Sequence, residues 1–298
     1  MAFTRHLGDP FVDALNDCYQ REGSWWRRIA DDPDVFIAIR DGYLNVYVSG
    51  GSLLRVGYTR SEGLVCSIHE EYLILRSPRA YVRLTRDQTP EVEMVQGTDG
   101  LAARYSAIKR RIARFSHPER AGENVIASRL PCIVDMEAAF SWEKGEPRRG
   151  RVGRVDLVAL APSGKLVLIE AKLLASPELR DGDPPSVVCQ LGDYHAWLRK
   201  DRLQLVKAYQ HVIELYRRLR GRFLQERVNQ LADTKVLDVH ARPRLLIFGF
   251  SEREKREYLK PLVAGLCQSS SDGRPTVDDI VTVGDPRNLT GRALLRGV

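Results

Sequence analysis

The feature that most constrains the fold is a pair of apolar runs joined by a short turn. Residues 153–160 and 165–173 are rich in Val, Leu and Ile, and Ala161-Pro-Ser-Gly164 separates them. This composition and spacing predict a β-hairpin with antiparallel strands. If the turn centres near Ser163, Asp156 and Glu170 each lie seven positions from that centre. The two carboxylates then face each other on one side of the sheet, and Lys172 shares their side because side chains alternate along a strand.

The segments around this hairpin predict an α/β fold. Apolar residues at helical or strand spacing precede and follow the hairpin, and the order of elements indicates a mixed sheet flanked by helices. We expect helices at 101–115, 119–129, 187–198, 203–231 and 252–266, and further strands at 132–142 and 244–250.

The first part of the chain predicts a separate β-rich module. After a helical pattern at 11–19, short β-branched or aromatic runs alternate with turn residues such as Asp41-Gly42. Strands are expected at 35–39, 43–48, 52–58, 64–68, 72–75 and 81–84. Polar, turn-rich residues near 88–100 suggest a boundary, so we predict a module at 1–100 and a second domain at 101–298. The module is expected to recognise substrate or a protein partner, although Trp25, Trp26 and the strand tyrosines are more typical of a core.

Composition and motifs exclude several classes of protein. Of the 298 residues 43% are hydrophobic and 29% are charged, which is typical of a globular chain. No apolar run is long enough to span a membrane and no secretion signal is recognisable, so we expect a cytoplasmic protein. The five cysteines are far apart, which argues against disulfides and a zinc cluster. Motifs of P-loop ATPases, zinc hydrolases and serine hydrolases are absent from the sequence.

Charged residues on the inner side of the hairpin need compensation. Asp156, Glu170 and Lys172 stand among apolar strand residues, and burying such charges is costly unless they are paired or bind a metal. Two carboxylates and the Ala171 carbonyl form a hard oxygen site suited to Mg²⁺, for which Mn²⁺ is an expected substitute. A metal there could polarise a phosphodiester, and Lys172 could hold or deprotonate a water molecule. The alternative is an ion pair with a purely structural role.

This pattern resembles the PD-(D/E)XK nuclease superfamily. Asp156 matches its first acidic position and Glu170-Ala171-Lys172 its [D/E]-x-K tripeptide, while Gly153-x-x-Asp156 and Gln190-x-x-x-Tyr194 match motifs of one branch. The resemblance covers roughly residues 119–250 and implies a restriction-endonuclease-like fold. Gln190 and Tyr194 are four residues apart on a predicted helix, so they share one face and can reach the same site.

The family usually adds a glutamate from the preceding helix. Glu123 is our choice for this additional catalytic and metal-binding position, because it lies on a predicted helix. Glu137 is the rival, but it lies in a strand-like run.

Basic residues are concentrated in the second part of the chain. Residues 1–105 hold 12 basic and 15 acidic side chains, whereas residues 106–298 hold 34 and 24. Such an imbalance favours a polyanionic partner. The residues expected to contact nucleic-acid phosphates precede or begin the Asp156 strand: Lys144, Arg148, Arg149, Arg151 and Arg154. A second basic group fits DNA contact and a solvated helix face equally well. Its members are Arg217, Arg218, Arg220, Arg222 and Arg227.

The sequence therefore predicts a magnesium-dependent nuclease, with DNA favoured over RNA and an endonuclease favoured over an exonuclease. Phage defence, restriction and repair are roles implied only by the family resemblance. The alternative is a catalytically inactive subunit with the nuclease fold that binds nucleic acid or assembles a multi-protein complex. A homo-oligomer is compatible with either prediction.

Overall fold

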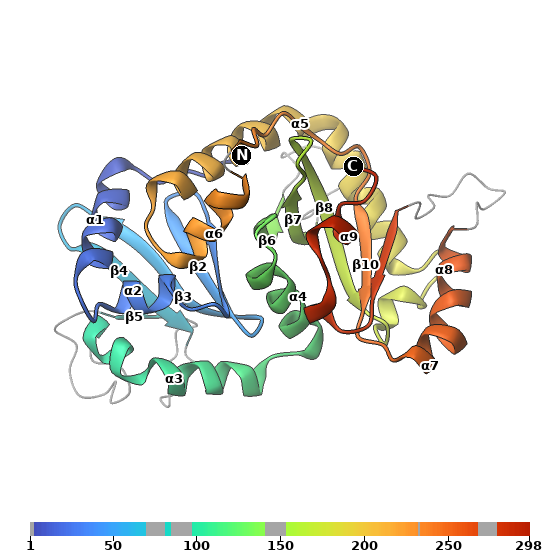
Figure 1. Cartoon of the computed structure of the whole chain (residues 1–298), viewed down its shortest axis with the longest axis horizontal. Helices are drawn as coiled ribbons and strands as arrows, with labels where there is room; N and C mark the ends of the chain where they lie inside the picture. The colour runs from blue at the N-terminus through green and yellow to red at the C-terminus, as the bar shows by residue number, and fades with distance from the viewer. Residues whose placement is uncertain (1–2, 70–80, 85–96, 141–152, 232, 268–278) are drawn as a thin grey trace. The chain divides into compact units, whose positions relative to one another are not determined.

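A computed structural model describes residues 3–69, 81–84, 97–140, 153–231, 233–267 and 279–298 (Figure 1). The chain divides into two compact units, each with its own sheet. We call residues 4–131 and 208–232 the N-terminal unit, and residues 1–3, 132–207 and 233–298 the C-terminal unit. This division differs from the predicted boundary at residue 100. The two helices nearest to that position, at 97–115 and 118–129, belong to the N-terminal unit, and the chain returns to this unit after residue 207.

The N-terminal unit contains a five-stranded antiparallel sheet with the strands in sequence order. This arrangement confirms five of the six predicted strands, and the predicted strand 72–75 lies outside the described residues. Gly42 adopts a φ of 77° in the turn between the first two strands, a conformation that glycine adopts without strain. The strands are β1 (Val35–Ile39), β2 (Tyr43–Val48), β3 (Gly51–Thr59), β4 (Gly63–His69) and β5 (Tyr81–Leu84).

Helices cover this antiparallel sheet, and their apolar residues fill its core (Figure 1). Trp25 and Trp26 are both buried, with their rings edge to face at 5.8 Å, so the prediction that they belong to the core is confirmed. Arg227 is also fully buried, with its guanidinium 3.5 Å from the centre of the Phe223 ring. The helices are α1 (Asp9–Gln20), α2 (Trp25–Ala30), α3 (Gly97–Phe115), α4 (Pro118–Arg129) and α6 (Arg222–Leu231).

The C-terminal unit is built on a mixed sheet, which confirms the predicted α/β class. The strand order is β11-β10-β8-β7-β6; β6, β7 and β8 pair antiparallel, whereas β8, β10 and β11 pair parallel. The sequence did not predict β11 or the short β9, which pairs with β8. The strands are β6 (Ile133–Ala139), β7 (Arg154–Leu160), β8 (Lys165–Leu173), β9 (Asp238–Val239), β10 (Arg244–Phe248) and β11 (Ile280–Val283).

Helices complete the C-terminal unit. The predicted helices at 187–198 and 203–231 form α5 (Ser186–Arg218), which has one non-helical residue at Asp201, and the separate α6. Residues 186–207 of α5 belong to this unit, whereas the rest of α5 and α6 belong to the N-terminal unit. The predicted helix 252–266 is α7 (Glu252–Glu254), a π-helical turn (Lys255–Leu259) and α8 (Lys260–Cys267), and α9 (Gly291–Leu294) lies near the end of the chain.

The predicted hairpin is formed by β7 and β8. Leu157 pairs with Ile169 and Leu160 with Leu166, so the register is centred on residue 163 as the sequence predicted. Gly164 has a φ of 81°, and a Cβ at this position would lie 2.6 Å from the Lys235 carbonyl oxygen. The turn therefore needs glycine for its backbone conformation and for its close approach to residue 235.

Two further findings concern the whole chain. None of the helices in the described residues has the length and apolar character needed to cross a membrane. All five cysteines are free thiols; three are buried and two are exposed. The buried thiols are those of Cys18, Cys66 and Cys132.

Candidate functional site

The hairpin register places Asp156 and Glu170 opposite each other. Leu157 and Ile169 form the last pair of the ladder, and Asp156 and Glu170 are the next residues of their strands. Continuing this register sets the two acids opposite each other, and directly opposed residues of antiparallel strands point to the same face. Asp156 Oδ2 also accepts a hydrogen bond of 2.9 Å from the backbone N–H of Ala171. The Asp156 carboxylate is therefore held in place by the backbone of β8.

Glu170 is almost fully buried, with a relative exposure of 2%. Its Oε2 lies 2.9 Å from the Tyr194 hydroxyl, which is also 3.0 Å from the carbonyl oxygen of Arg154. Burial raises the pKa of Glu170, and the neighbouring Lys172 and Tyr194 partly offset that rise. Burial and the charge of Glu170 likewise raise the pKa of Tyr194. The Tyr194 hydroxyl therefore keeps its proton at neutral pH and acts as a hydrogen-bond donor to this end of the hairpin.

Lys172 lies between two carboxylates. Its Nζ is 2.8 Å from Glu170 Oε1 and 2.7 Å from Glu178 Oε2, and only 7% of its side chain is exposed. Burial by itself lowers the pKa of Lys172, but the charges of Glu170 and Asp156 outweigh this effect and raise it. Lys172 is therefore an ammonium ion at neutral pH. This charge state favours the expected role of holding a water molecule and opposes the role of removing its proton.

Sequence reasoning missed Glu178. This residue lies in a short 3-10 helix, Pro177–Leu179, in the loop between β8 and α5. The Arg180 guanidinium anchors the loop by donating to the Leu174 carbonyl at 2.7 Å, and Ser186 Oγ donates to the Glu178 carbonyl at 3.4 Å. No periodic pattern extends into this polar loop, so only its folded course brings Glu178 to Lys172.

Gln190 and Tyr194, the predicted pair on α5, differ in their contacts. Tyr194 binds Glu170, whereas Gln190 Oε1, one turn earlier, is buried and has no hydrogen-bond partner among the described residues. Gly153 explains why Tyr194 can reach the hairpin, since a Cβ on this glycine would lie 3.1 Å from the Tyr194 hydroxyl oxygen. The Gly-x-x-Asp and Gln-x-x-x-Tyr motifs thus meet through a direct contact of Gly153 with Tyr194.

The additional glutamate was assigned to Glu123, with Glu137 as the rival. Glu123 is buried on α4 in the N-terminal unit, whereas Glu137 lies on β6 in the same unit as the hairpin. The pairs Met136 with Leu157 and Ala138 with Val155 place Glu137 across from Asp156. The structure therefore brings Glu137, which sequence analysis ranked second, to the neighbourhood of Asp156.

Asp135 is a second acid of β6 that sequence analysis did not single out. It is 1% exposed and pairs with Val158, two residues along β7 from Asp156. The signal was available, because Asp135 and Glu137 interrupt an apolar strand as Asp156 interrupts its own strand.

Comparisons with protein-family models, curated proteins and solved structures found no match to this chain. The candidate site is therefore interpreted from its geometry and from the motifs in the sequence.

The residues predicted to bind nucleic acid are only partly described. Lys144, Arg148, Arg149 and Arg151 lie outside the described residues. Arg154 begins β7 with 47% of its side chain exposed, and its guanidinium forms an ion pair with Glu137.

The second basic group contains both buried and exposed arginines. Arg227 is buried, so DNA contact is excluded for this residue, and its guanidinium donates to the Ala127 carbonyl. Arg218 pairs with Asp9, and Arg222 pairs with Glu226. These contacts support the interpretation of a structural and solvated helix face.

The donor set at the hairpin fits a metal that needs few protein ligands. Within the described residues, no group of three or more His, Cys, Asp and Glu side chains is arranged to hold a metal ion. Mg²⁺ is often held by one or two carboxylates while water and substrate phosphates supply its other ligands. Asp156 and Glu170 supply two carboxylates of this kind at one end of the hairpin.

Proposed function

We propose that this chain is a magnesium-dependent nuclease with a restriction-endonuclease-like C-terminal unit, and that DNA is its substrate. The observation that carries the proposal is the hairpin register, in which Asp156 and Glu170 directly follow the pair of Leu157 with Ile169, together with the ion pair of Lys172 with Glu170. The mixed sheet flanked by helices supports it, as do the contacts of Tyr194 with Glu170 and Gly153.

In this proposal each residue has a distinct role. Asp156 and Glu170 would hold the metal, which when bound would withdraw charge from the scissile phosphate and activate a water molecule. The Lys172 ammonium offsets negative charge on the phosphate and orients the water. Tyr194 and the Ala171 N–H fix the orientation of the two carboxylates.

A cleavage assay tests the proposal. Purified protein is incubated with supercoiled plasmid, linear duplex, single-stranded DNA and RNA in the presence of Mg²⁺, Mn²⁺ or EDTA. We expect nicking of the plasmid with either metal and none with EDTA. Asp156→Asn and Glu170→Gln preserve side-chain shape, and each should reduce the rate by at least about 100-fold, as the loss of a single group that stabilises the transition state does.

A matched control separates chemistry from folding. Glu257→Gln changes an exposed carboxylate of the same unit, which pairs on the surface with Arg253, and it should cleave like the unmodified protein. Circular dichroism and thermal melting confirm that each variant is folded. Unchanged cleavage by a folded Asp156→Asn or Glu170→Gln variant would refute the assignment.

The alternative function is a nucleic-acid-binding or assembly subunit that has the fold without the activity. The observation that favours it is the position of Lys172, whose ammonium already balances Glu170 and Glu178. Calorimetric titration with Mg²⁺ and Mn²⁺ discriminates between the two. A nuclease should bind the metal and lose that binding on Asp156→Ala, whereas the alternative predicts DNA binding that is indifferent to the metal.

The biological role in this proposal is implied only by the family resemblance. We place the activity in the cytoplasm and in phage defence, restriction or repair, with the N-terminal unit recognising substrate or a protein partner. Comparing the survival of phage-infected cells that carry the unmodified gene or the Glu170→Gln variant tests the defence role.

A further inference from the structure

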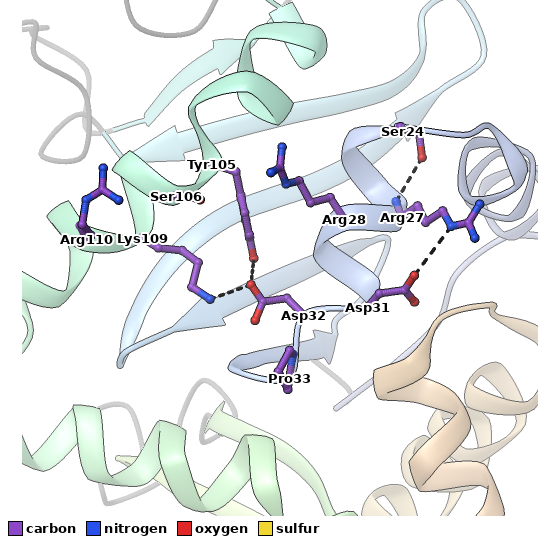
Figure 2. A pocket seen from close by; sticks show the side chains of 11 residues that line it. Ser24, Arg27, Arg28, Asp31, Asp32, Pro33, Tyr105, Ser106, Lys109 and Arg110 are labelled. Carbon is purple, nitrogen blue, oxygen red and sulfur yellow. Dashed lines mark hydrogen bonds and ion pairs between the residues drawn. The ribbon is translucent and has the colours of Figure 1, made fainter.

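A hollow of about 730 Å³ lies within the N-terminal unit, between α2 and α3 (Figure 2). Its volume is in the range of small-ligand pockets, about 300–1,000 Å³. Four cationic side chains line it, two from each helix, together with two aspartates and Tyr105. The cationic residues are Arg27, Arg28, Lys109 and Arg110.

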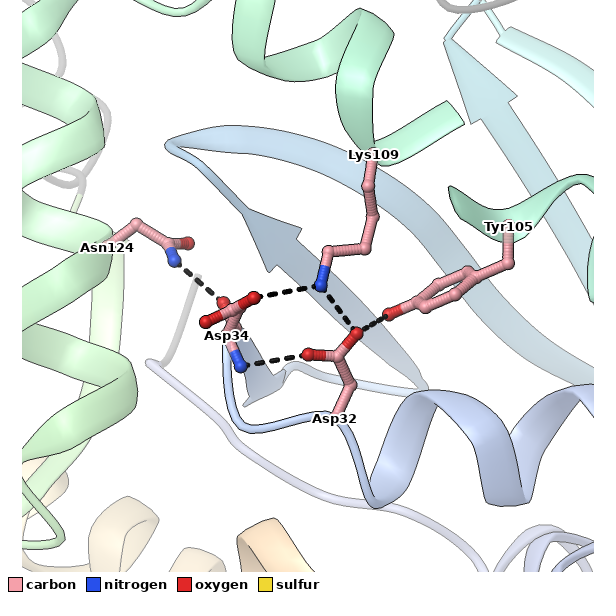
Figure 3. Close-up of polar contacts among 5 residues, drawn as sticks. All are labelled: Asp32, Asp34, Tyr105, Lys109 and Asn124. Atoms are coloured by element: carbon pink, nitrogen blue, oxygen red, sulfur yellow. Dashed lines mark hydrogen bonds and ion pairs between the residues drawn. The ribbon is translucent and has the colours of Figure 1, made fainter. Parts of the chain in front are cut away.

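Asp32 accepts hydrogen bonds from three donors of the protein itself. Its Oδ2 accepts hydrogen bonds from the Tyr105 hydroxyl at 2.8 Å and from Lys109 Nζ at 2.6 Å, and its Oδ1 accepts one from the Asp34 N–H at 2.9 Å (Figure 3). Lys109 also contacts the Asp34 carboxylate at 3.0 Å. Burial lowers the pKa of Lys109, but its bonds to these two aspartates outweigh burial and raise it. The Lys109 ammonium is therefore engaged by both acids on this side of the hollow.

Asp31 is also committed to internal donors. Its Oδ1 accepts from the Tyr19 hydroxyl at 2.9 Å and from the Arg222 N–H at 3.0 Å. Arg27 Nε lies 3.8 Å from Asp31 Oδ2, which is beyond hydrogen-bond distance. The carboxylates of the hollow thus satisfy tyrosine, lysine and backbone donors, and they leave the Arg27 guanidinium with little pairing.

Two arginines consequently offer donors to a ligand. The Arg27 guanidinium packs 5.6 Å from the centre of the Tyr19 ring, and 47% of its side chain is exposed. Arg110 is exposed and forms no ion pair with any described residue. Arg28 lies between these two in Figure 2, with its guanidinium 6.0 Å from the centre of the Tyr105 ring. Guanidinium groups present paired N–H donors that match the oxygens of phosphate.

We propose that this hollow is a binding site for a compact, multiply charged phosphate ligand of the size of a nucleoside diphosphate. Four cationic side chains and two aspartates line the hollow, so its lining has an excess of positive charge that favours an anion. Two arginines without a close acidic partner among the described residues suit at least two negative charges. The cations come from two helices and border one hollow, whereas a nucleic-acid strand needs cations spaced along an extended track. This proposal does not depend on the hairpin site, because every residue that it uses belongs to the N-terminal unit.

Isothermal titration calorimetry of the full chain tests the site. The probes are inorganic pyrophosphate, ADP, adenosine and a 12-nucleotide single-stranded DNA, each in buffer with EDTA so that no divalent metal contributes. We expect pyrophosphate and ADP to bind, with affinity falling as salt rises, and adenosine not to bind. Arg27→Ala and Arg110→Ala should each weaken ADP binding by about tenfold, as expected for the loss of one charge-assisted hydrogen bond.

Arg114→Ala is the matched control, because Arg114 is an exposed arginine one turn further along α3 that does not line the hollow. It should bind ADP with unchanged affinity. Arg110 has no ion pair to lose among the described residues, so its replacement should leave the melting temperature unchanged. This variant keeps the test valid if Arg27→Ala is unstable. Absence of pyrophosphate and ADP binding, binding of the oligonucleotide alone, or equal affinity in the Arg110→Ala and Arg114→Ala variants would overturn the proposal.

Discussion

Replacing Lys172 by methionine removes the ammonium ion between Glu170 and Glu178 while keeping most of the side-chain volume. Glu170 is 2% exposed and lies 2.8 Å from Lys172 Nζ, so the variant leaves a buried carboxylate without its cation. Breaking a buried ion pair by removing one partner costs about 3–5 kcal/mol. The contact with Glu178 adds little, because that side chain is 40% exposed and is solvated in the variant. We therefore expect Lys172→Met to lower the free energy of unfolding of the C-terminal unit by about 3–5 kcal/mol.

A double-mutant cycle identifies the source of this loss. Glu170→Gln removes the buried negative charge and keeps an oxygen that can accept from Tyr194. The double variant Glu170→Gln/Lys172→Met should therefore be more stable than Lys172→Met alone, by about 2 kcal/mol, since coupled neighbours deviate from additivity by this amount. Urea denaturation followed by circular dichroism measures the global change, and hydrogen exchange of residues 154–173 reports the stability of the hairpin itself.

Lys260→Met is the matched control, because this lysine is exposed on α8 in the same unit. It should change stability by less than about 0.5 kcal/mol. If Lys172→Met behaves like this control, or if the double variant is no more stable than the single one, the reasoning from a buried ion pair is refuted.

Three other predictions follow from the described contacts. Tyr194→Phe should lower the unfolding free energy by about 1.5–3 kcal/mol, because it deletes the hydroxyl beside Glu170 without leaving a large cavity; urea denaturation should show the loss, and no change would contradict the contact. Two thiols, those of Cys189 and Cys267, should react rapidly with an aromatic disulfide reagent in the native protein, with the remaining thiols reacting only after denaturation; rapid labelling of all five would contradict the burial. At neutral pH the unmodified protein should be more stable than Lys109→Met, and this difference should disappear as pH rises past 10.5, because a lysine with a raised pKa stabilises the folded protein only while it is protonated. A stability difference that grows at high pH would contradict the raised pKa of Lys109.

The sequence predicted most of the C-terminal sheet because local patterns specify it. Alternating and continuous apolar runs indicated β7, β8 and β10, and the turn residues set the hairpin register correctly. In contrast, the two-residue β9 is too short for a periodic signal. The sequence analysis overlooked β11, a β-branched run of the same length as the predicted β5. The division into units was also outside the reach of local patterns, because residues 208–232 return to the first sheet from a distant part of the chain.

The candidate site shows the same limit at the level of side chains. Hairpin spacing placed Asp156, Glu170 and Lys172 on one face, and the family resemblance pointed to Tyr194. The contact of Tyr194 with Gly153, the approach of Glu178 and the position of Glu137 across from Asp156 required the packed structure. In each of these cases the two residues belong to different elements of the chain. Rules of spacing within one helix or hairpin do not predict contacts between such elements.

What the sequence by itself determined is the hairpin and the chemical character of its inner face, because side-chain alternation and turn geometry act over only a few residues. What only the tertiary structure decided is which charges meet. The ion pairs of Lys172 with Glu178 and of Lys109 with Asp32 each join residues from different elements. Such contacts depend on how helices and loops pack around each sheet, and packing is a property of the whole fold.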